Sequence, residues 1–350
     1  MVRRPDNPRP GLVVIDKPQG LTSHDVVSRV RRLAHTRKVG HGGTLDPMAT
    51  GVLVIGIGKA TKLLTWVSGH SKEYRATIRF GVATNTDDAE GVATAAVGCA
   101  SLSEEELESA LAPLRGDIMQ VPSTVSAIKV NGKRAYALVR AGEDVELAAR
   151  PVRISRLQVL APPRPAEYVC DEADGENVPD AELPSGPVSV VDVDVVVECS
   201  SGTYVRALAR DAGEALGVGA HLTALRRTRV GDVTVESAVT LDELSAAVEA
   251  ATLEGEPEAE PILPLVPLGE AARTMFPTLL LTEAEAGAFA HGQAPRHSRG
   301  ELAQWATEVG YRPDGSSEEE ASPIAALAPD GTVLGLLRID EARLRTVLVF

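Results

Sequence analysis

The part of the sequence best suited to chemistry is residues 38–51, KVGHGGTLDPMATG, in which His41 and Asp46 stand among glycines and a proline. The glycines and the proline argue against a regular element, so a loop is predicted over residues 39–51. Loops held by apolar flanking strands commonly present reactive groups. A carboxylate such as Asp46 can act as a nucleophile or stabilise an electron-poor sugar carbon. Taken alone, Asp46 before proline also suits a turn, and His41 suits a loop hydrogen bond.

A phosphate-binding loop is the obvious rival, because residues 56–61, GIGKAT, follow an apolar segment and open a helical one. The pattern fails in detail. A Walker A loop requires glycine where Leu53 stands and serine or threonine where Ala60 stands. A dinucleotide-binding turn requires a third glycine where Thr61 stands. The sequence therefore favours no nucleotide cofactor.

The charge is unevenly distributed. The net charge of -14 argues against a nucleic-acid-binding protein when taken over the whole chain. However, residues 166–187, 249–260 and 314–320 hold 7, 5 and 4 acidic residues and no lysine or arginine, and without these acids the net charge is +2. Residues 1–80 carry 14 lysines and arginines against 5 acidic residues. This pattern is compatible with an anionic substrate that meets one face, although chance clustering of solvated charge would also produce it.

The three cysteines, Cys99, Cys170 and Cys199, lie far apart and form no metal-binding or disulfide pattern, so free thiols and no metal site are predicted. The longest apolar runs are far shorter than the roughly 20 residues that span a bilayer. No signal-peptide pattern stands at residues 1–17. A cytoplasmic protein is therefore expected.

Hydrophobic periodicity predicts the elements that must hold the loop. A helix that begins at Thr22 or Ser23 has apolar residues at helical spacing, and a capping box predicts a second helix from Ser103. Strands are expected at 11–15, 52–57, 73–80 and 188–199, helices at 59–67, 103–111, 204–216 and 279–292, and C-terminal strands at 332–339 and 344–349. The order lacks a regular βαβ repeat, so the predicted class is α+β.

Residues 40–53, GHGGTLDPMATGVL, resemble the motif G-H-x-G-x-L-D-P-x-A-x-G-x-L of the TruB family of tRNA pseudouridine synthases. Further segments match in the family's order: DKP at 16–18, KEY at 72–74, SAIKVNGKRAY at 126–136, CSSGTYVR at 199–206, GAHL at 219–222 and LRR at 225–227. The resemblance extends over about residues 10–240. It implies the pseudouridine synthase fold, with a central mixed, largely antiparallel sheet flanked by helices.

The resemblance also implies roles for individual residues. Asp46 would be the catalytic aspartate, Arg206 its ion-pair partner and Tyr74 the aromatic platform under the target base. The implied substrate-binding residues are His41, Tyr204, Leu225, Lys17 and Lys129. The reaction would isomerise uridine at position 55 in the T loop of tRNA, without metal, nucleotide or flavin.

These roles make chemical sense. The reaction breaks the N-glycosidic bond, turns the uracil and rejoins it through C5. An ionised carboxylate can attack C1′ of the sugar or C6 of the base, and both routes stay open. The base must leave its stack, which costs a few kcal/mol and calls for an aromatic surface to receive it. A guanidinium beside the carboxylate would keep it charged where burial disfavours charge.

The predicted organisation is a catalytic domain over residues 10–250, with an acidic, disordered hairpin extension at about 166–187 that projects away from bound RNA. An acidic linker at 251–268 follows, and then a small β-rich, PUA-like RNA-binding domain at 270–350. Ser123 and Val125 depart from the family's usual proline and tyrosine. The expected partner is the T arm of tRNA, and a monomer with no obligate protein partner is expected.

Two other functions remain as alternatives. The chain could be a tRNA-binding and folding chaperone in which catalysis is secondary. It could also be a small-molecule glycosidase, if a second carboxylate stood close to Asp46, although no motif supplies one.

Overall fold

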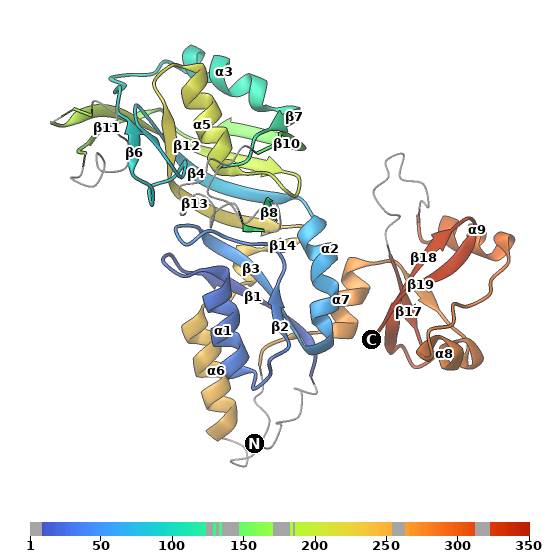
Figure 1. Cartoon of the computed structure of the whole chain (residues 1–350). Coiled ribbons are helices and arrows are strands. Elements are labelled where there is room, and N and C mark those ends of the chain that lie inside the picture. Colours follow the sequence, from blue (N-terminus) through green and yellow to red (C-terminus); the bar gives the residue numbers. More distant parts are fainter. Residues whose placement is uncertain are drawn as a thin grey trace.

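The computed structural model describes residues 9–123, 129–130, 133–134, 147–170, 183–184, 186–253, 263–311 and 323–350. The chain forms a large sheet unit, followed by a smaller C-terminal unit that lies beside it (Figure 1). Among the residues described, no helix combines the length and the apolar character that crossing a membrane would require.

The large unit is built on one sheet of eleven strands in the order β15-β1-β3-β13-β4-β12-β10-β7, with β2, β11 and β14 attached to β3, β12 and β13. Every pair is antiparallel except β13 with β3. The strands are β1 (Gly11–Lys17), β2 (Val39–His41), β3 (Thr50–Ile57), β4 (Lys72–Phe80), β7 (Gly116–Gln120), β10 (Arg150–Val159), β11 (Arg164–Tyr168), β12 (Val188–Cys199), β13 (Ala220–Val230), β14 (Val233–Thr234) and β15 (Val266–Pro267). The predicted mixed, largely antiparallel sheet is thus confirmed.

Four helices cover this sheet and share one apolar core with it. Helices α1 (Ser23–Leu33) and α6 (Leu241–Leu253) lie together, and α3 (Glu104–Leu111) and α5 (Val205–Ala215) form a second pair (Figure 1). The capping box predicted at Ser103 is present in α3, and Thr22, one of the two predicted caps of α1, also forms a capping box with Asp25. The α+β class is therefore confirmed.

The central strands follow the alternation in the sequence. The valines at 193, 195 and 197 of β12 are buried in the core, whereas Asp192 and Asp194 face outwards. Asp192 pairs with Arg79 directly across from it on β4, with Nε to Oδ1 at 2.8 Å, and Asp194 pairs with Arg164 on β11. One face of β12 is therefore polar, as the alternation predicts.

The smaller unit has a four-stranded sheet in the order β16-β17-β18-β19. Its elements are β16 (Thr278–Leu280), α8 (Glu283–Ala290), α9 (Arg299–Glu308), β17 (Ile324–Leu327), β18 (Val333–Asp340) and β19 (Arg343–Val349). Helix α7 (Leu268–Met275) connects it to the large unit, and a shared apolar cluster joins α7 to β1, β3 and α2 (Leu64–Gly69). The remaining short elements are η1 (Gly58–Leu63), β5 (Ala83–Thr84), β6 (Ala93–Ala95), η2 (Ala112–Leu114), β8 (Lys129–Val130), β9 (Lys133–Arg134) and η4 (Val235–Ser237).

Several predicted boundaries need correction. The loop predicted over residues 39–51 begins with strand β2 and ends in β3, because the flanking residues add to the sheet edge. The helix predicted at 59–67 is a 3-10 turn followed by the short α2, and the one at 279–292 is β16 followed by α8.

The linker predicted at 251–268 is corrected at both ends. Helix α6 continues to Leu253, and Val266–Pro267 returns to the large sheet as β15 beside β1. Residues 254–262 lie outside the described part. In the predicted hairpin extension, β11 and β12 form the two paired arms, so residues 166–168 are ordered strand, and residues 171–182 lie outside the described part.

Candidate active site

The loop that carries Asp46 runs between β2 and β3 and is tied to the scaffold at several points. Leu45 exchanges two hydrogen bonds with the buried Ser23 hydroxyl at the start of α1. Gly51, where β3 leaves the loop, has φ +99°, and a Cβ there would lie 2.1 Å from the Arg227 carbonyl oxygen. Only glycine fits so close to the neighbouring strand, which explains the glycine at this end of the motif.

Lys17 supports this loop from inside the protein. Its ammonium donates to the carbonyl oxygens of Leu21 at 2.6 Å, Pro18 at 3.0 Å and Pro47 at 3.2 Å, and the residue is fully buried. Burial lowers its pKa to about 8. The expected substrate-binding role is therefore corrected: all three N–H groups are occupied by the backbone, so Lys17 positions the residues around Asp46.

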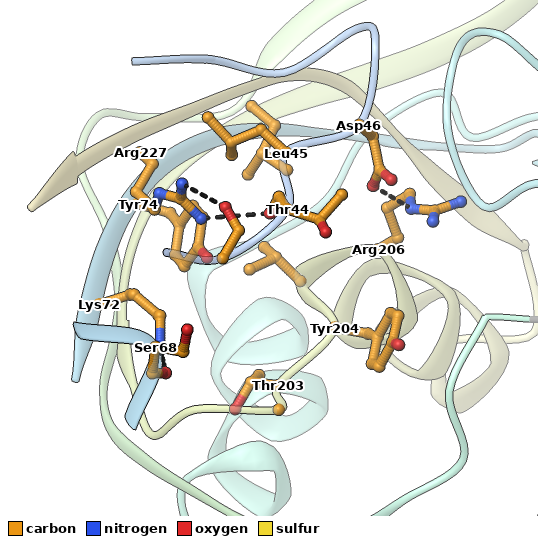
Figure 2. Close-up of a pocket in the computed structure, with 14 residues that line it drawn as sticks. Thr44, Leu45, Asp46, Ser68, Lys72, Tyr74, Thr203, Tyr204, Arg206 and Arg227 are labelled. Atoms are coloured by element: carbon orange, nitrogen blue, oxygen red, sulfur yellow. Dashed lines mark hydrogen bonds and ion pairs between the residues drawn. The ribbon is translucent and has the colours of Figure 1, made fainter. Parts of the chain in front are cut away.

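Asp46 forms the ion pair with Arg206 that the resemblance implies, with Oδ2 3.0 Å from Nε (Figure 2). The other edge of the guanidinium lies 3.2 Å from Asp88 Oδ2 and donates to the Thr86 carbonyl oxygen at 2.6 Å. The side chains of Arg206 and Asp88 are 5% and 4% exposed, whereas that of Asp46 is 38% exposed. Arg206 is thus fixed from behind by Asp88 and holds the Asp46 carboxylate at the pocket surface.

The surroundings of Asp46 have opposing effects on the pKa of its carboxyl group. Burial raises its pKa, and the negative charge of Asp88 adds to this effect. The positive charge of Arg206 is the largest opposing influence. The guanidinium therefore favours the ionised form, which a nucleophile or a stabiliser of positive charge requires.

A pocket of about 270 Å³ opens beside this ion pair. Tyr74 lies in its wall on β4, and Tyr204 lines it at the start of α5 (Figure 2). Leu225 lines it from β13. The lining residues are Gly43, Thr44, Leu45, Asp46, Ser68, Lys72, Tyr74, Gly202, Thr203, Tyr204, Val205, Arg206, Leu225 and Arg227. Five of the eight expected site residues thus meet at one cavity: Asp46, Arg206, Tyr74, Tyr204 and Leu225.

His41 does not line this pocket. Its ring makes an edge-on contact with His24 on α1, with ring centroids 5.9 Å apart, and its buried Nδ1 has no hydrogen-bond partner among the residues that the structure describes. Burial lowers its pKa, and the positive charges of His24 and Arg227 add to this. His41 therefore lies in contact with α1 and outside the pocket lining. Lys129 lies in β8, but its side chain lies outside what the structure describes.

Sequence reasoning missed three charged residues of the site: Lys72, Asp88 and Arg227. Lys72 and Arg227 stand inside matched segments, which could have drawn attention to them, and both line the pocket. Asp88 lies in a turn rich in threonine and aspartate, and this composition was the only feature of the sequence that could have pointed to it. Asp88 does not line the pocket, so it does not form with Asp46 the pair of carboxylates that glycosidases place around a substrate. In the described part of the chain, no group of three or more potential metal ligands comes together.

Comparison with known proteins places this site in a family. Residues 31–205 match the family model "TruB family pseudouridylate synthase (N terminal domain)", and residues 206–267 match "tRNA pseudouridylate synthase B C-terminal domain". The chain belongs to the TruB family of pseudouridylate synthases. The boundary between the two TruB models falls at the start of α5, so both cover parts of the same sheet.

Individual relatives are similar to this chain over most or nearly all of its length. A tRNA pseudouridine synthase B from Arthrobacter sp. (strain FB24) is 49% identical over 340 residues, which cover 97% of this chain and 96% of the relative. One from Mycobacteroides abscessus is 54% identical over 285 residues, which cover 81% and 84%. A chain of an H/ACA RNP bound to a substrate RNA containing 2′-deoxyuridine has the same fold, with a TM-score of 0.61 and 22% identity over 97% of this TruB chain and 84% of that one.

Proposed function

We propose that this chain isomerises uridine to pseudouridine in tRNA, at position 55 of the T loop, with Asp46 as the catalytic carboxylate. The observation that carries the proposal is the Asp46 carboxylate itself, held by Arg206 at the surface of a pocket lined by Tyr74. The named relatives, which share about half of their residues with this chain, support tRNA as the substrate.

The charge of Asp46 suits either chemical route. As a nucleophile it would bond to C1′ while the base departs, or to C6 of the ring while the glycosidic bond is weakened. Both routes require an ionised carboxylate in a pocket that disfavours charge, and Arg206 supplies the opposing charge. Asp88 fixes Arg206 from behind, so the guanidinium does not need to reorganise during the reaction.

The pocket suits a single flipped base. At about 270 Å³ it is near the lower limit of ligand pockets, so it would hold one nucleotide that has left its stack. Tyr74 would stack on the uracil, and its hydroxyl could take part in removing the proton from C5. Leu225 and Tyr204 would close the pocket around the base.

The rest of the chain supports binding to the T arm. Basic residues concentrate in the first 80 residues, which include α1 and the Asp46 loop. The small C-terminal sheet unit would add RNA contacts. We propose that the chain acts in the cytoplasm, as a monomer, and without a cofactor.

The test is pseudouridine formation in unmodified tRNA transcripts by the wild type, Asp46→Asn and the matched control Asp117→Asn, with tRNA affinity measured for each. Asp117 makes a surface ion pair with Arg153 and is 76% exposed. We expect product at the T-loop uridine from the wild type and the control, and no product with retained binding from Asp46→Asn. Tight binding without product from any of them would instead support the tRNA-folding chaperone.

A further inference from the structure

Lys72 lies in the pocket wall as a buried cation. Its Nζ donates to the carbonyl oxygens of Ser68 at 2.6 Å and His70 at 2.8 Å, and the residue is only 7% exposed. No carboxylate of the described residues lies within ion-pair distance of it. Burial, with the positive charge of Arg227 next, lowers its pKa to about 8, which leaves the ammonium mostly charged at neutral pH.

Arg227 is a second cation of the same kind. Its guanidinium donates to the carbonyl oxygens of Val52 at 2.8 Å, Gly43 at 3.1 Å and Thr44 at 3.2 Å, and the residue is 1% exposed. Within the described parts of the chain it, too, has no carboxylate partner. A guanidinium stays protonated in proteins, so a positive charge is buried here among carbonyl dipoles, without an opposite charge in contact among the described residues.

Strand register brings these two cations to either side of Tyr74. Arg227 on β13 stands directly opposite Tyr74 on β4. Lys72 precedes Tyr74 by two residues on the same strand, so both side chains point to the same face. All three line the pocket (Figure 2). A base that rests on Tyr74 would therefore lie close to two positive charges that have no carboxylate partner among the described residues.

The other side of the pocket has the opposite polarity. There Asp46 and Asp88 flank Arg206, and nearby Lys17 and Glu90 add one charge of each sign, so the carboxylates outnumber the cations by one. Figure 2 shows Asp46 and Arg206 on one side of the cavity and Lys72 and Arg227 on the other. The pocket is thus negative where Asp46 would meet the sugar and positive where the base would rest.

This polarity matches the charge separation of the proposed reaction. When the C1′–N1 bond breaks, its electron pair stays with the base, and electron-poor C1′ bonds to a carboxylate oxygen of Asp46. If the carboxylate adds to C6 instead, the electron pair of the C5–C6 bond moves towards O4. In the first route, C5 of the uracil anion then attacks C1′ and displaces the Asp46 carboxylate. In the second route, the C1′–N1 bond breaks within the adduct, C5 bonds to C1′, and Asp46 leaves C6 as the C5–C6 double bond reforms. In both routes the base carries negative charge until C5 bonds to C1′, and C5 finally loses a proton while N1 gains one.

We propose that Lys72 and Arg227 are catalytic residues that stabilise the negative charge on uracil after the glycosidic bond breaks or the base is attacked. The inference rests on the proposed function and adds the cationic side of the same site. Fixed charges aimed at developing charge in a dry pocket are worth far more than in water, and their loss costs on the order of 100-fold in rate.

The test compares single-turnover rates on T-arm hairpins that carry either uridine or 5-fluorouridine at the target position, measured as loss of the N-linked nucleoside. Fluorine withdraws electrons and stabilises the base anion, so its reaction depends less on the protein's cations. We expect Lys72→Met and Arg227→Met to slow uridine on the order of 100-fold, and to slow 5-fluorouridine clearly less.

Two controls separate charge from structure. Lys72→Arg and Arg227→Lys keep the charge, so they should preserve the wild-type ratio of the two rates even if both rates fall. Arg226→Met removes a neighbouring arginine that pairs with Asp16, with Nη2 2.7 Å from Oδ2, and lies outside the pocket lining, so it should leave both rates unchanged.

The outcomes are distinct. Equal slowing of both substrates by the methionine variants, or weaker RNA binding with an unchanged rate, would show that the two cations bind phosphate or support the fold, and would overturn the inference. No product from the wild type on uridine would overturn the proposed function itself, and this inference with it.

Discussion

Ser23 and Leu45 hold each other through two buried hydrogen bonds: the Ser23 hydroxyl donates to the Leu45 carbonyl oxygen at 3.0 Å and accepts from the Leu45 N–H at 2.8 Å. Ser23 is the first residue of α1, and Leu45 directly precedes Asp46. One hydroxyl therefore connects the rigid start of a helix to the residue beside the proposed catalytic carboxylate.

Replacing Ser23 by alanine should loosen Asp46. The buried N–H and C=O of Leu45 would both lose their partner, at a cost of about 1–3 kcal/mol in the free energy of unfolding for each unsatisfied group. We expect the single-turnover rate to fall, because the carboxylate is displaced. The fall should be at most roughly 100-fold, which is what a 1 Å misplacement can cost. Urea unfolding and the rate on a tRNA transcript measure the two effects. Ser28→Ala, on the exposed face of α1, is the matched control.

Asp46→Asn should abolish activity without lowering the stability of the protein. Because burial raises the pKa of Asp46, the folded protein binds this proton more tightly than the unfolded chain does. The ionised carboxylate then reduces stability as pH rises through the window between the unfolded and the folded pKa. At neutral pH we expect Asp46→Asn to unfold at the same temperature as the wild type or higher, while losing activity.

The pH dependence provides the check for this variant. Its stability advantage should disappear as the pH is lowered below the ordinary pKa of an aspartate, where Asp46 is protonated in both states. An advantage that grows on acidification would contradict the assignment of a raised pKa to Asp46.

Lys17→Met tests the corrected role of Lys17. The three carbonyl oxygens that accept from its ammonium would lose their donor, so the variant should be less stable and slower in the chemical step, with little change in tRNA affinity. With a folded pKa of about 8, the unfolded state binds more protons between about pH 8 and 10.5. The wild type should therefore gain stability relative to Lys17→Met as pH rises through that window. A variant that loses tRNA affinity at an unchanged rate would restore the substrate-binding role.

Local pattern predicted the elements around the site well. The stripe of Val26, Val27 and Val30 gave α1, and the alternation of valine and aspartate gave β12, because each pattern follows directly from one buried face. The pairing of Asp46 with Arg206 was implied by the resemblance to the TruB family and not by a local pattern, and the structure shows this ion pair.

Strand β13 was not predicted from the sequence, because its arginines interrupt the apolar pattern by which a buried strand is identified. Arg226 pairs with Asp16, Arg227 binds carbonyl oxygens of the Asp46 loop, and Arg229 pairs with Glu198. The first of these partners lies 210 residues away in the sequence. No local pattern reveals that a polar segment will find such partners, or that Lys17 points inwards while Lys72 faces the pocket.

Helix α2 contacts both the Asp46 loop and the C-terminal unit. On the loop side, a Cβ added at Gly42 would lie 2.7 Å from Val67, and Ser68 lines the pocket. On the other side, Trp66 meets Phe276 edge-on, with ring centroids 5.7 Å apart. The position of the C-terminal unit should therefore affect the pocket through α2.

Phe276→Ala should cost about 3–5 kcal/mol in stability and also lower kcat, because α2 loses its outer support and the Asp46 loop shifts with it. Phe289→Ala is the matched control, since Phe289 is fully buried in the separate core of the C-terminal sheet. It should destabilise that unit and weaken tRNA binding while the single-turnover rate of bound substrate stays near that of the wild type. If both variants lower kcat equally, α2 does not transmit the effect. If Phe276→Ala instead raises KM and leaves kcat unchanged, the C-terminal unit acts on catalysis only through RNA binding.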